Sequence, residues 1–244
     1  MKILLVEDDN MHADFLLEIV EQTLPEFDEI LVANNGKEAE TLAHRHQITA
    51  IVMDLRMKEH NGIEAARTIW AGRPNTRILF WSNYSDEAYL RGITRIVPDQ
   101  AAYGYVLKTA TQDKMRLALR AVLIEAQIVV DREVHQIQAQ QMRSRSALTE
   151  FEYLILLDLA LGLPDKAIAM RRKLSLRTVQ NRLLSLYDKL DVEAHDQNEM
   201  GVVLNKRTRA VSSAIARKII NREGLITANK ELSVWLERPS VSQD

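Results

Sequence analysis

Polar side chains follow four short apolar runs in the first half of the chain, at the point where each run ends. The runs span residues 3–6, 51–53, 78–81 and 105–107. The side chains that follow them are those of Glu7, Asp8, Asp54, Ser82 and Lys108. If the runs are strands of one parallel sheet, their carboxyl ends meet at one edge, where open α/β folds place their ligands. We therefore expect three acids, a hydroxyl and an amine in one pocket.

This set of side chains favours metal-dependent phosphoryl chemistry. Carboxylates as close as Glu7, Asp8 and Asp54 would repel one another unless a divalent cation neutralised them, and all-oxygen ligation suits Mg²⁺. With the cation bound, Asp54 could attack a phosphoryl group, because the metal and the Lys108 ammonium offset the charge that develops on the oxygens. Ser82 could donate a hydrogen bond to the product, an aspartyl phosphate.

The elements that would position these residues alternate along the chain. Helical patterns follow each apolar run, and residues 30–33 form one further strand, so residues 1–125 are predicted to form a five-stranded, doubly wound parallel sheet. Residues 126–146 are rich in Gln and charge and are predicted to be a linker. From residue 147 onward every apolar pattern is helical, which predicts a second, all-α domain.

Composition limits the class of protein. The 244 residues include no cysteine, which excludes disulfides and thiolate metal sites, and no run of 18 apolar residues lacks a charge. We expect a cytoplasmic protein with no membrane segment. Residues 1–125 hold 14 basic and 19 acidic residues, a net charge of −5, whereas residues 145–222 hold 14 and 9, a net charge of +5. A polyanionic partner is therefore plausible for the second domain.

The second domain has the start signals of a helix-turn-helix. Thr149 and Glu152 form a capping-box pattern, Asp165 is predicted to cap a short helix, and Ser175 to cap the next one. Two helices joined by such a turn fit a motif whose second helix enters the major groove of DNA. The residues 193–244 that follow are predicted to be a helical extension with a possible role in dimerisation.

The first domain resembles the receiver domain of bacterial two-component response regulators. The resemblance rests on the acid pair Glu7 and Asp8, on Asp54, Ser82 and Lys108, and on Tyr105 three residues before Lys108. It implies that Asp54 is the phosphoacceptor for a sensor histidine kinase, and that Asp8 binds Mg²⁺ directly and Glu7 through water. It further implies that the backbone carbonyl of Arg56 is a metal ligand and that Ser82 and Tyr105 are the switch pair.

Within the second domain, at residues 147–192, a set of residues matches a known pattern: Leu148, Thr149, Glu152, Gly162, Lys166, Ile168, Ala169, Ser175, Thr178, Val179, Lys189 and Leu190. On these residues the segment 148–192 resembles the LuxR/NarL-type helix-turn-helix domain, with a recognition helix at residues 176–190. This resemblance implies DNA contacts from six side chains, those of Lys166, Arg177, Thr178, Gln180, Asn181 and Arg182. Gln180 and Leu184 stand where the family often has lysine, and Arg172 where an apolar core residue is expected. Either the Arg172 stem extends to solvent or the short helix is shifted.

The first helix of the second domain, residues 151–161, is apolar almost all round and therefore needs a second partner. The receiver, the C-terminal tail and a second copy of the chain are the candidates. In that tail we predict a helix over residues 204–221 that Gly224 terminates, and an extra helix over residues 227–236.

Other classes fit less well. A haloacid-dehalogenase-like phosphatase would need an acid where Arg56 stands, and a dinucleotide-binding fold would need glycines after the first strand. We expect a regulator rather than an enzyme, with a sensor histidine kinase, promoter DNA and a second copy of the chain as partners. A receiver whose helical domain binds protein rather than DNA stays open as an alternative.

Overall fold

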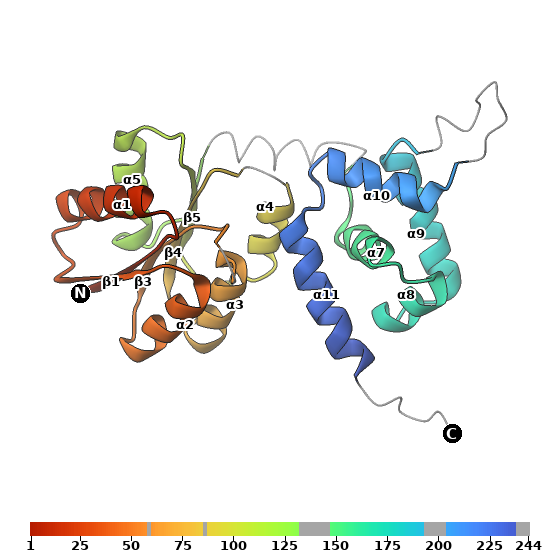
Figure 1. The fold of residues 1–244 in the computed structure, drawn as a ribbon, viewed down its shortest axis with the longest axis horizontal. Coiled ribbons are helices and arrows are strands. Elements are labelled where there is room, and N and C mark those ends of the chain that lie inside the picture. The colour runs from red at the N-terminus through yellow and green to blue at the C-terminus, as the bar shows by residue number, and fades with distance from the viewer. Residues whose placement is uncertain (58–59, 85–86, 132–146, 193–203, 238–244) are drawn as a thin grey trace. The chain divides into compact units, whose positions relative to one another are not determined.

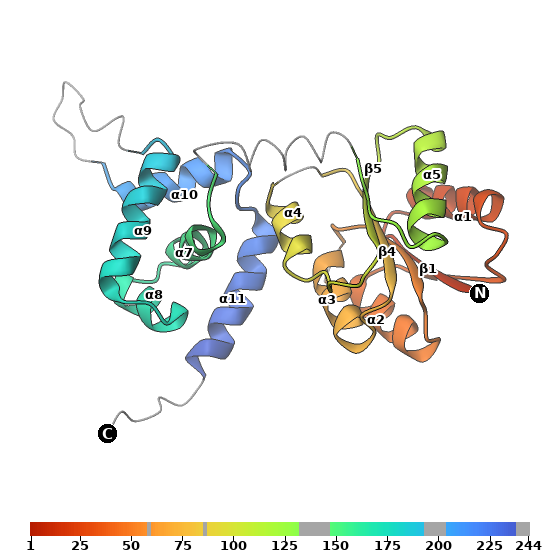
Figure 2. The same ribbon diagram turned by 180° about the vertical axis from the view of Figure 1, so that it is seen from behind.

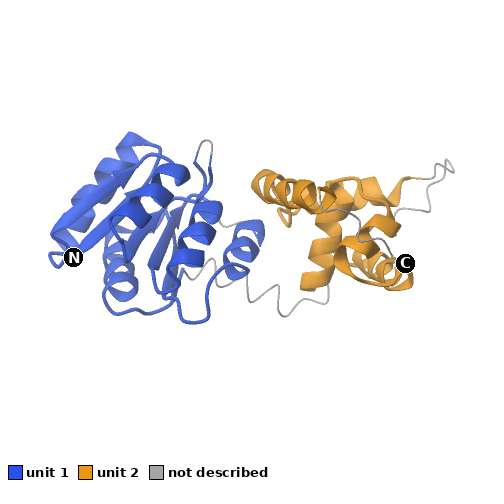
Figure 3. Ribbon diagram, turned by 90° about the horizontal axis from the view of Figure 1, so that it is seen from below, with its two compact units in different colours: residues 1–137 blue, residues 138–244 orange. Residues whose placement is uncertain are grey.

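The computed structural model describes residues 1–57, 60–84, 87–131, 147–192 and 204–237. The chain divides into two compact units, residues 1–137 and residues 138–244 (Figure 3). Within the described residues, no helix is both long and apolar enough to cross a membrane.

The first unit is built on a parallel sheet with the strand order β2-β1-β3-β4-β5-β6 (Figure 1). Its strands are β1 (Lys2–Val6), β2 (Glu29–Ala33), β3 (Ala50–Met53), β4 (Arg77–Ser82), β5 (Tyr103–Leu107) and β6 (Val129–Val130). The register aligns Val6 with Met53, and Met53 with Phe80, so that β1, β3 and β4 end at the same edge. The residues after these strands therefore lie together.

Five helices cover the two faces of this sheet, as Figures 1 and 2 show from opposite sides. They are α1 (Asn10–Thr23), α2 (Gly36–Arg45), α3 (Gly62–Gly72), α4 (Glu87–Thr94) and α5 (Gln112–Leu123). Alternate residues of β1 serve the two faces: Ile3 and Leu5 pack with residues of α1 and α5, whereas Leu4 and Val6 pack with residues of α2, α3 and α4. The doubly wound α/β prediction is confirmed.

The sheet has one strand more than the sequence predicted. Val129 and Val130, which we assigned to the linker, pair in parallel with Gly104 and Tyr105 of β5, and the Asp131 amide donates to the Tyr105 carbonyl oxygen at 2.9 Å. A strand of two residues carries no periodic signal, because period-2 alternation needs a longer run. The remainder of the predicted linker, residues 132–146, lies outside the described residues.

The second unit is all-α, as predicted, and is arranged around its first helix. Its helices are α7 (Glu150–Ala160), α8 (Asp165–Arg172), α9 (Leu176–Lys189), α10 (Lys206–Ala216) and α11 (Arg222–Leu236). Helix α7 contacts each of the other four. Tyr153 on α7 shares a core with Ala228 and Leu232 of α11. The C-terminal tail therefore packs against α7, the helix that is apolar almost all round.

Several predicted helix boundaries in this unit are wrong. The helix predicted over residues 204–221 is α10, which ends at Ala216, and the extra helix predicted over residues 227–236 is α11, which begins at Arg222. Asp165 does not cap α8: Pro164 occupies the N-cap position without a side-chain hydrogen bond, and the Asp165 carboxylate pairs instead with Arg207. Gly224 does not end a helix. It lies in the first turn of α11, where its amide donates to Oδ1 of the N-cap residue Asn221 at 2.8 Å. At Asp165 a tertiary contact, the pair with Arg207, takes the carboxylate that the local pattern assigned to capping.

Candidate functional site

The carboxyl edge of the sheet brings three acids together. Carboxylate oxygens of Glu7, Asp8 and Asp54 all lie within 4.8 Å of one another. Glu7 and Asp54 are buried, with 1 % and 6 % of their surfaces exposed, and Asp8 is half-buried. Backbone hydrogen bonds set this geometry, because the Asp54 amide donates to the Val6 carbonyl oxygen at 2.9 Å. The expectation that strand ends gather these acids agrees with the structure.

Lys108 is the cation of this cluster. Its ammonium donates to Glu7 Oε2 at 2.7 Å and to Asp54 Oδ2 at 3.2 Å, and only 5 % of its side chain is exposed. The Lys108 backbone amide donates to the Ser82 carbonyl oxygen at 2.9 Å, which fixes the residue to the end of β4. One ammonium therefore bridges the carboxylates that follow β1 and β3.

Burial and the cation act in opposite directions on these carboxylates. Burial raises the pKa of Asp54, and the Lys108 charge and hydrogen bond oppose that rise. The pKa of Glu7 is also raised, first by burial and further by the Asp54 charge, while Lys108 lowers it. The cluster combines three carboxyl groups with one amine. This oxygen-rich donor set fits a hard divalent cation.

The loop after Asp54 approaches the strand end closely. A Cβ on Gly62 would lie 2.1 Å from the Asp54 carbonyl oxygen, so only glycine fits there. The Gly62 amide donates to the Leu55 carbonyl oxygen at 3.0 Å, and the Leu55 amide donates to Asp54 Oδ1 at 2.7 Å. The loop is thus folded back onto the residue that would react.

Tyr84, which the sequence analysis missed, connects the candidate switch residues. The Tyr105 hydroxyl donates to the Tyr84 carbonyl oxygen, and the Tyr84 amide lies 3.4 Å from Ser82 Oγ. Ser82 and Tyr105 are both buried. The Arg56 guanidinium donates to the Tyr84 hydroxyl and lies over its ring, 5.2 Å from the centroid. The loops after β3 and β4 therefore meet through Tyr84.

His12 and Trp81 were also missed. The Lys108 ammonium lies 4.9 Å from the Trp81 ring centroid and 3.3 Å from His12 Nδ1. The His12 and Trp81 rings meet edge to face at 5.5 Å, and Phe15 stacks on Trp81. No motif identifies these residues, although the position of His12 in the helix that begins after the acid pair was a usable signal.

The predicted helix-turn-helix is formed by α8 and α9. Ser175 caps α9 and accepts from the Thr178 amide at 3.0 Å. Five of the six candidate DNA-contacting residues are exposed, while Thr178 is half-buried and shares a hydrogen bond with Ser175; the exposed five are Lys166, Arg177, Gln180, Asn181 and Arg182. At about 100° per residue, Arg177, Gln180 and Asn181 share a face, whereas Arg182 lies about 140° from Arg177 on the flank.

Two buried carboxylates of α7 hold this motif together. Glu152 accepts from Lys189 Nζ at 2.7 Å and from the Ser185 hydroxyl at 2.7 Å, both on α9. Asp158, completely buried, accepts two hydrogen bonds from Arg172, at 2.6 and 2.7 Å, and one from Arg171 at 2.6 Å. Arg172 thus occupies a core position by pairing with a buried acid, which neither of the two expectations anticipated.

Comparisons with known proteins identify the family of the chain. Residues 3–120 match the family model described as the response regulator receiver domain. The chain is 32 % identical, over 90 % of its length and 98 % of the relative's, to the transcriptional regulatory protein YdfI of Bacillus subtilis. It is 29 % identical to the DNA-binding transcriptional activator DevR/DosR of Mycobacterium tuberculosis, over 86 % of this chain and 97 % of that protein.

The fold is also similar to that of RcsB in a structure of two RcsB dimers bound to two parallel DNAs. That match has a TM-score of 0.56 and 17 % identity, and covers 89 % of this chain and 98 % of RcsB. The chain belongs to the response regulator family, since a relative above 30 % identity is covered over nearly its whole length.

Proposed function

We propose that this response regulator accepts a phosphoryl group on Asp54 from a sensor histidine kinase and controls transcription by binding promoter DNA. The proposal that Asp54 is phosphorylated rests on the cluster of Glu7, Asp8 and Asp54, in which the Lys108 ammonium bridges Glu7 and Asp54. The receiver-domain match over residues 3–120 supports the same assignment.

Each residue of the cluster has a task in the transfer. Asp8 and Glu7, with the backbone carbonyl of Arg56, would hold Mg²⁺ beside Asp54. When bound, Mg²⁺ supplies positive charge that neutralises phosphoryl oxygens. Asp54 Oδ attacks the phosphorus, and the bond from phosphorus to the donor's imidazole nitrogen breaks. Lys108 then donates to the phosphoryl group, and Ser82 contributes a further hydrogen bond.

Phosphorylation would reach the output through the contacts of Tyr84. Movement of Ser82 towards a phosphoryl group displaces Tyr84, whose carbonyl oxygen accepts the Tyr105 hydrogen bond. We propose Ser82 and Tyr105 as the switch pair on this basis.

DNA binding by the second unit is supported by the cap and turn geometry of α8 and α9 and by the exposed cations of that motif. The names of the relatives, a transcriptional regulator and a DNA-binding activator, favour it further. We propose that the active form binds DNA as a homodimer, as RcsB does in the complex of two RcsB dimers with two parallel DNAs. One of the features that favoured a protein-binding output, the apolar surface of α7, is partly accounted for, because Tyr153 of α7 packs with Ala228 and Leu232 of α11.

The first experiment tests the phosphoacceptor. We expect the intact chain to gain the mass of one phosphoryl group on treatment with a small phosphodonor and Mg²⁺, and to gain none when the cation is chelated. Asp54→Asn should gain none, whereas Asp9→Asn, which keeps the side-chain oxygen that caps α1, should gain it. Incorporation into Asp54→Asn would refute the site.

The second experiment tests the output. Selection from random duplex DNA should enrich a two-fold symmetric site with the phosphodonor-treated protein. Arg177→Ala should weaken binding of that site by about tenfold, within the range for a charged hydrogen bond. Arg182→Ala should weaken it less, because Arg182 lies on the helix flank. No enrichment, with Asp54 demonstrably phosphorylated, would favour a protein partner.

A further inference from the structure

Two apolar side chains of α9 are exposed, Leu176 at 37 % and Leu184, and Leu184 is the more exposed of them. Leu184 is 58 % exposed and lies one turn after Gln180 and Asn181 and two turns after Arg177, which places the four residues on one face of the helix. The opposite face, with Val179, Leu183 and Leu186, is buried in the core. Leu184 therefore lies on the surface of α9 that would face a groove of DNA.

The chemistry of the major groove offers one apolar group to such a side chain. Every base pair presents hydrogen-bond donors or acceptors there, but only thymine adds a methyl group. Gln180 and Asn181 carry the amides that pair with adenine through two hydrogen bonds. Leu184 follows them by about 5.4 Å along the helix axis, a distance of one to two base pairs.

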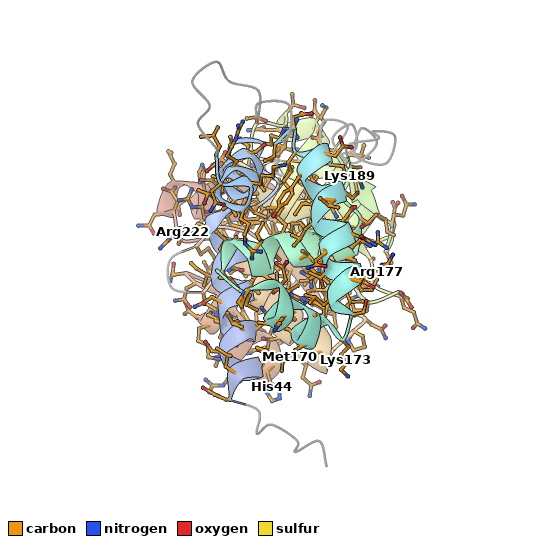
Figure 4. The ribbon with its side chains drawn as sticks, turned by 90° about the vertical axis from the view of Figure 1, so that its right-hand side faces the viewer. His44, Met170, Lys173, Arg177, Lys189 and Arg222 are labelled. Carbon is orange, nitrogen blue, oxygen red and sulfur yellow. The ribbon has the colours of Figure 1, made fainter. Side chains whose placement is uncertain are left out.

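Charge around Leu184 favours nucleic acid over an apolar protein partner. Lys173 and Arg177, which Figure 4 labels near the turn between α8 and α9, are exposed, as is Lys166. Asp188, one turn beyond Leu184 on the same face, is also exposed. Its carboxylate would be repelled by phosphates, so the stretch of α9 that can approach DNA ends near Leu184.

We propose that Leu184 is a specificity-determining residue that contacts the 5-methyl group of a thymine in each half-site, next to an A·T pair that Gln180 or Asn181 contacts. This inference rests on the proposed DNA binding and adds what the bound sequence must contain. A lysine at this position would attract phosphate or guanine, whereas leucine selects the methyl group.

The test uses the full-length protein and the duplex enriched by selection. Each thymine of that duplex is replaced, one at a time, by deoxyuridine, which pairs identically but lacks the methyl group. For the wild-type protein we expect one replacement per half-site to weaken binding about fourfold, the effect of burying one methyl group. Leu184→Ala should bind the unmodified duplex correspondingly less tightly and lose sensitivity to that replacement.

Met170→Ala is the matched control. Met170, which is labelled in Figure 4, lies on α8 and is 71 % exposed. Its variant should keep the wild-type sensitivity to deoxyuridine. Because Leu184 contributes little to the core, Leu184→Ala should fold, and an unchanged unfolding temperature would verify this.

The outcomes separate the inference from the proposed function. If wild type and Leu184→Ala show the same penalty at every thymine, or if no thymine matters to the wild-type protein, DNA binding stands and the role of Leu184 is refuted. If the wild-type protein enriches no duplex, the proposed DNA binding itself fails, and the inference fails with it.

Discussion

Lys108 shows how one side chain can set the electrostatics of a whole site. Its ammonium is 2.7 Å from Glu7 and 3.2 Å from Asp54, so it partly offsets the burial that raises the pKa of both carboxyls. The sequence predicted Lys108 and the acids because each follows an apolar run. It did not predict His12, Trp81 or Tyr84, because these residues reach the site through contacts between separate elements.

The effect of Lys108 can be measured on phosphorylation. Lys108→Ala removes the ammonium that donates to Asp54, so we expect phosphoryl incorporation to slow by about ten- to a hundredfold, as for the loss of a charged hydrogen bond. Lys114→Ala, at an exposed position of α5, is the control and should react at the wild-type rate. A wild-type rate in Lys108→Ala would contradict the role assigned to this residue.

Glu152 gives a prediction about stability and pH. Burial alone would raise its pKa, but hydrogen bonds from Lys189, from the Thr149 amide and from Ser185 outweigh burial and lower the pKa to about 2. A lowered carboxyl pKa adds stability above the unfolded value, here 4.5, and that stability is lost as the pH falls towards 2. The contribution at neutral pH is about 3 kcal/mol.

Chemical unfolding of the full chain would test this. We expect Glu152→Gln to unfold at lower denaturant concentration than wild type at pH 7, and the difference between the two proteins to narrow steadily below pH 4.5. A difference that is independent of pH would show that Glu152 acts through shape rather than charge.

At the scale of the elements, the sequence predicts helices, strands and caps correctly where the local signals are strong. The alternation of strands and helices, the capping box at Thr149 and the cap at Ser175 all agree with the structure. Prediction from the sequence failed for β6, which is too short for a periodic pattern, and for the start of α8, where Asp165 pairs with Arg207 forty-two residues later in the chain. It foresaw that α7 needs another partner, but not which of the three candidates provides it.

A substitution at Gly104 would test how closely β5 packs against β4, α5 and β6. A Cβ at this position would lie 2.6 Å from Leu79 Cδ1, 2.8 Å from Val122 Cγ2 and 3.2 Å from the Val129 carbonyl oxygen. Gly104→Ala should therefore destabilise the first unit by about 1–3 kcal/mol, the usual cost of overpacking. Gly72→Ala is the control, because no atom lies within 4 Å of its added Cβ. Equal unfolding free energies for the two variants would refute this local crowding.

At the scale of the whole molecule, the buried residues form cores that belong to one unit or the other. Two clusters lie on the two faces of the sheet in the first unit, and the third lies among the helices of the second. Each unit therefore has the buried apolar surface needed to fold cooperatively by itself.

Calorimetry of the full chain should accordingly show two unfolding transitions. Leu232→Ala removes a side chain that joins the core of the second unit and should lower only one transition, at a cost of about 2 kcal/mol. Gly104→Ala should lower only the other. A single transition that both substitutions shift would show that the units unfold together.

The position of α11 has a consequence for the gene. Helix α11 contributes Ala228 and Leu232 to the core around α7, and its Ala228 carbonyl oxygen accepts a hydrogen bond from Arg171. A nonsense codon shortly before Arg222 would therefore remove part of that core. The truncated product would expose the apolar face of α7, and cellular proteases would degrade it. Mutational screens should therefore recover nonsense alleles near the codon for Arg222 as null alleles, as readily as they recover null alleles in the codons for Glu7, Asp8 and Asp54.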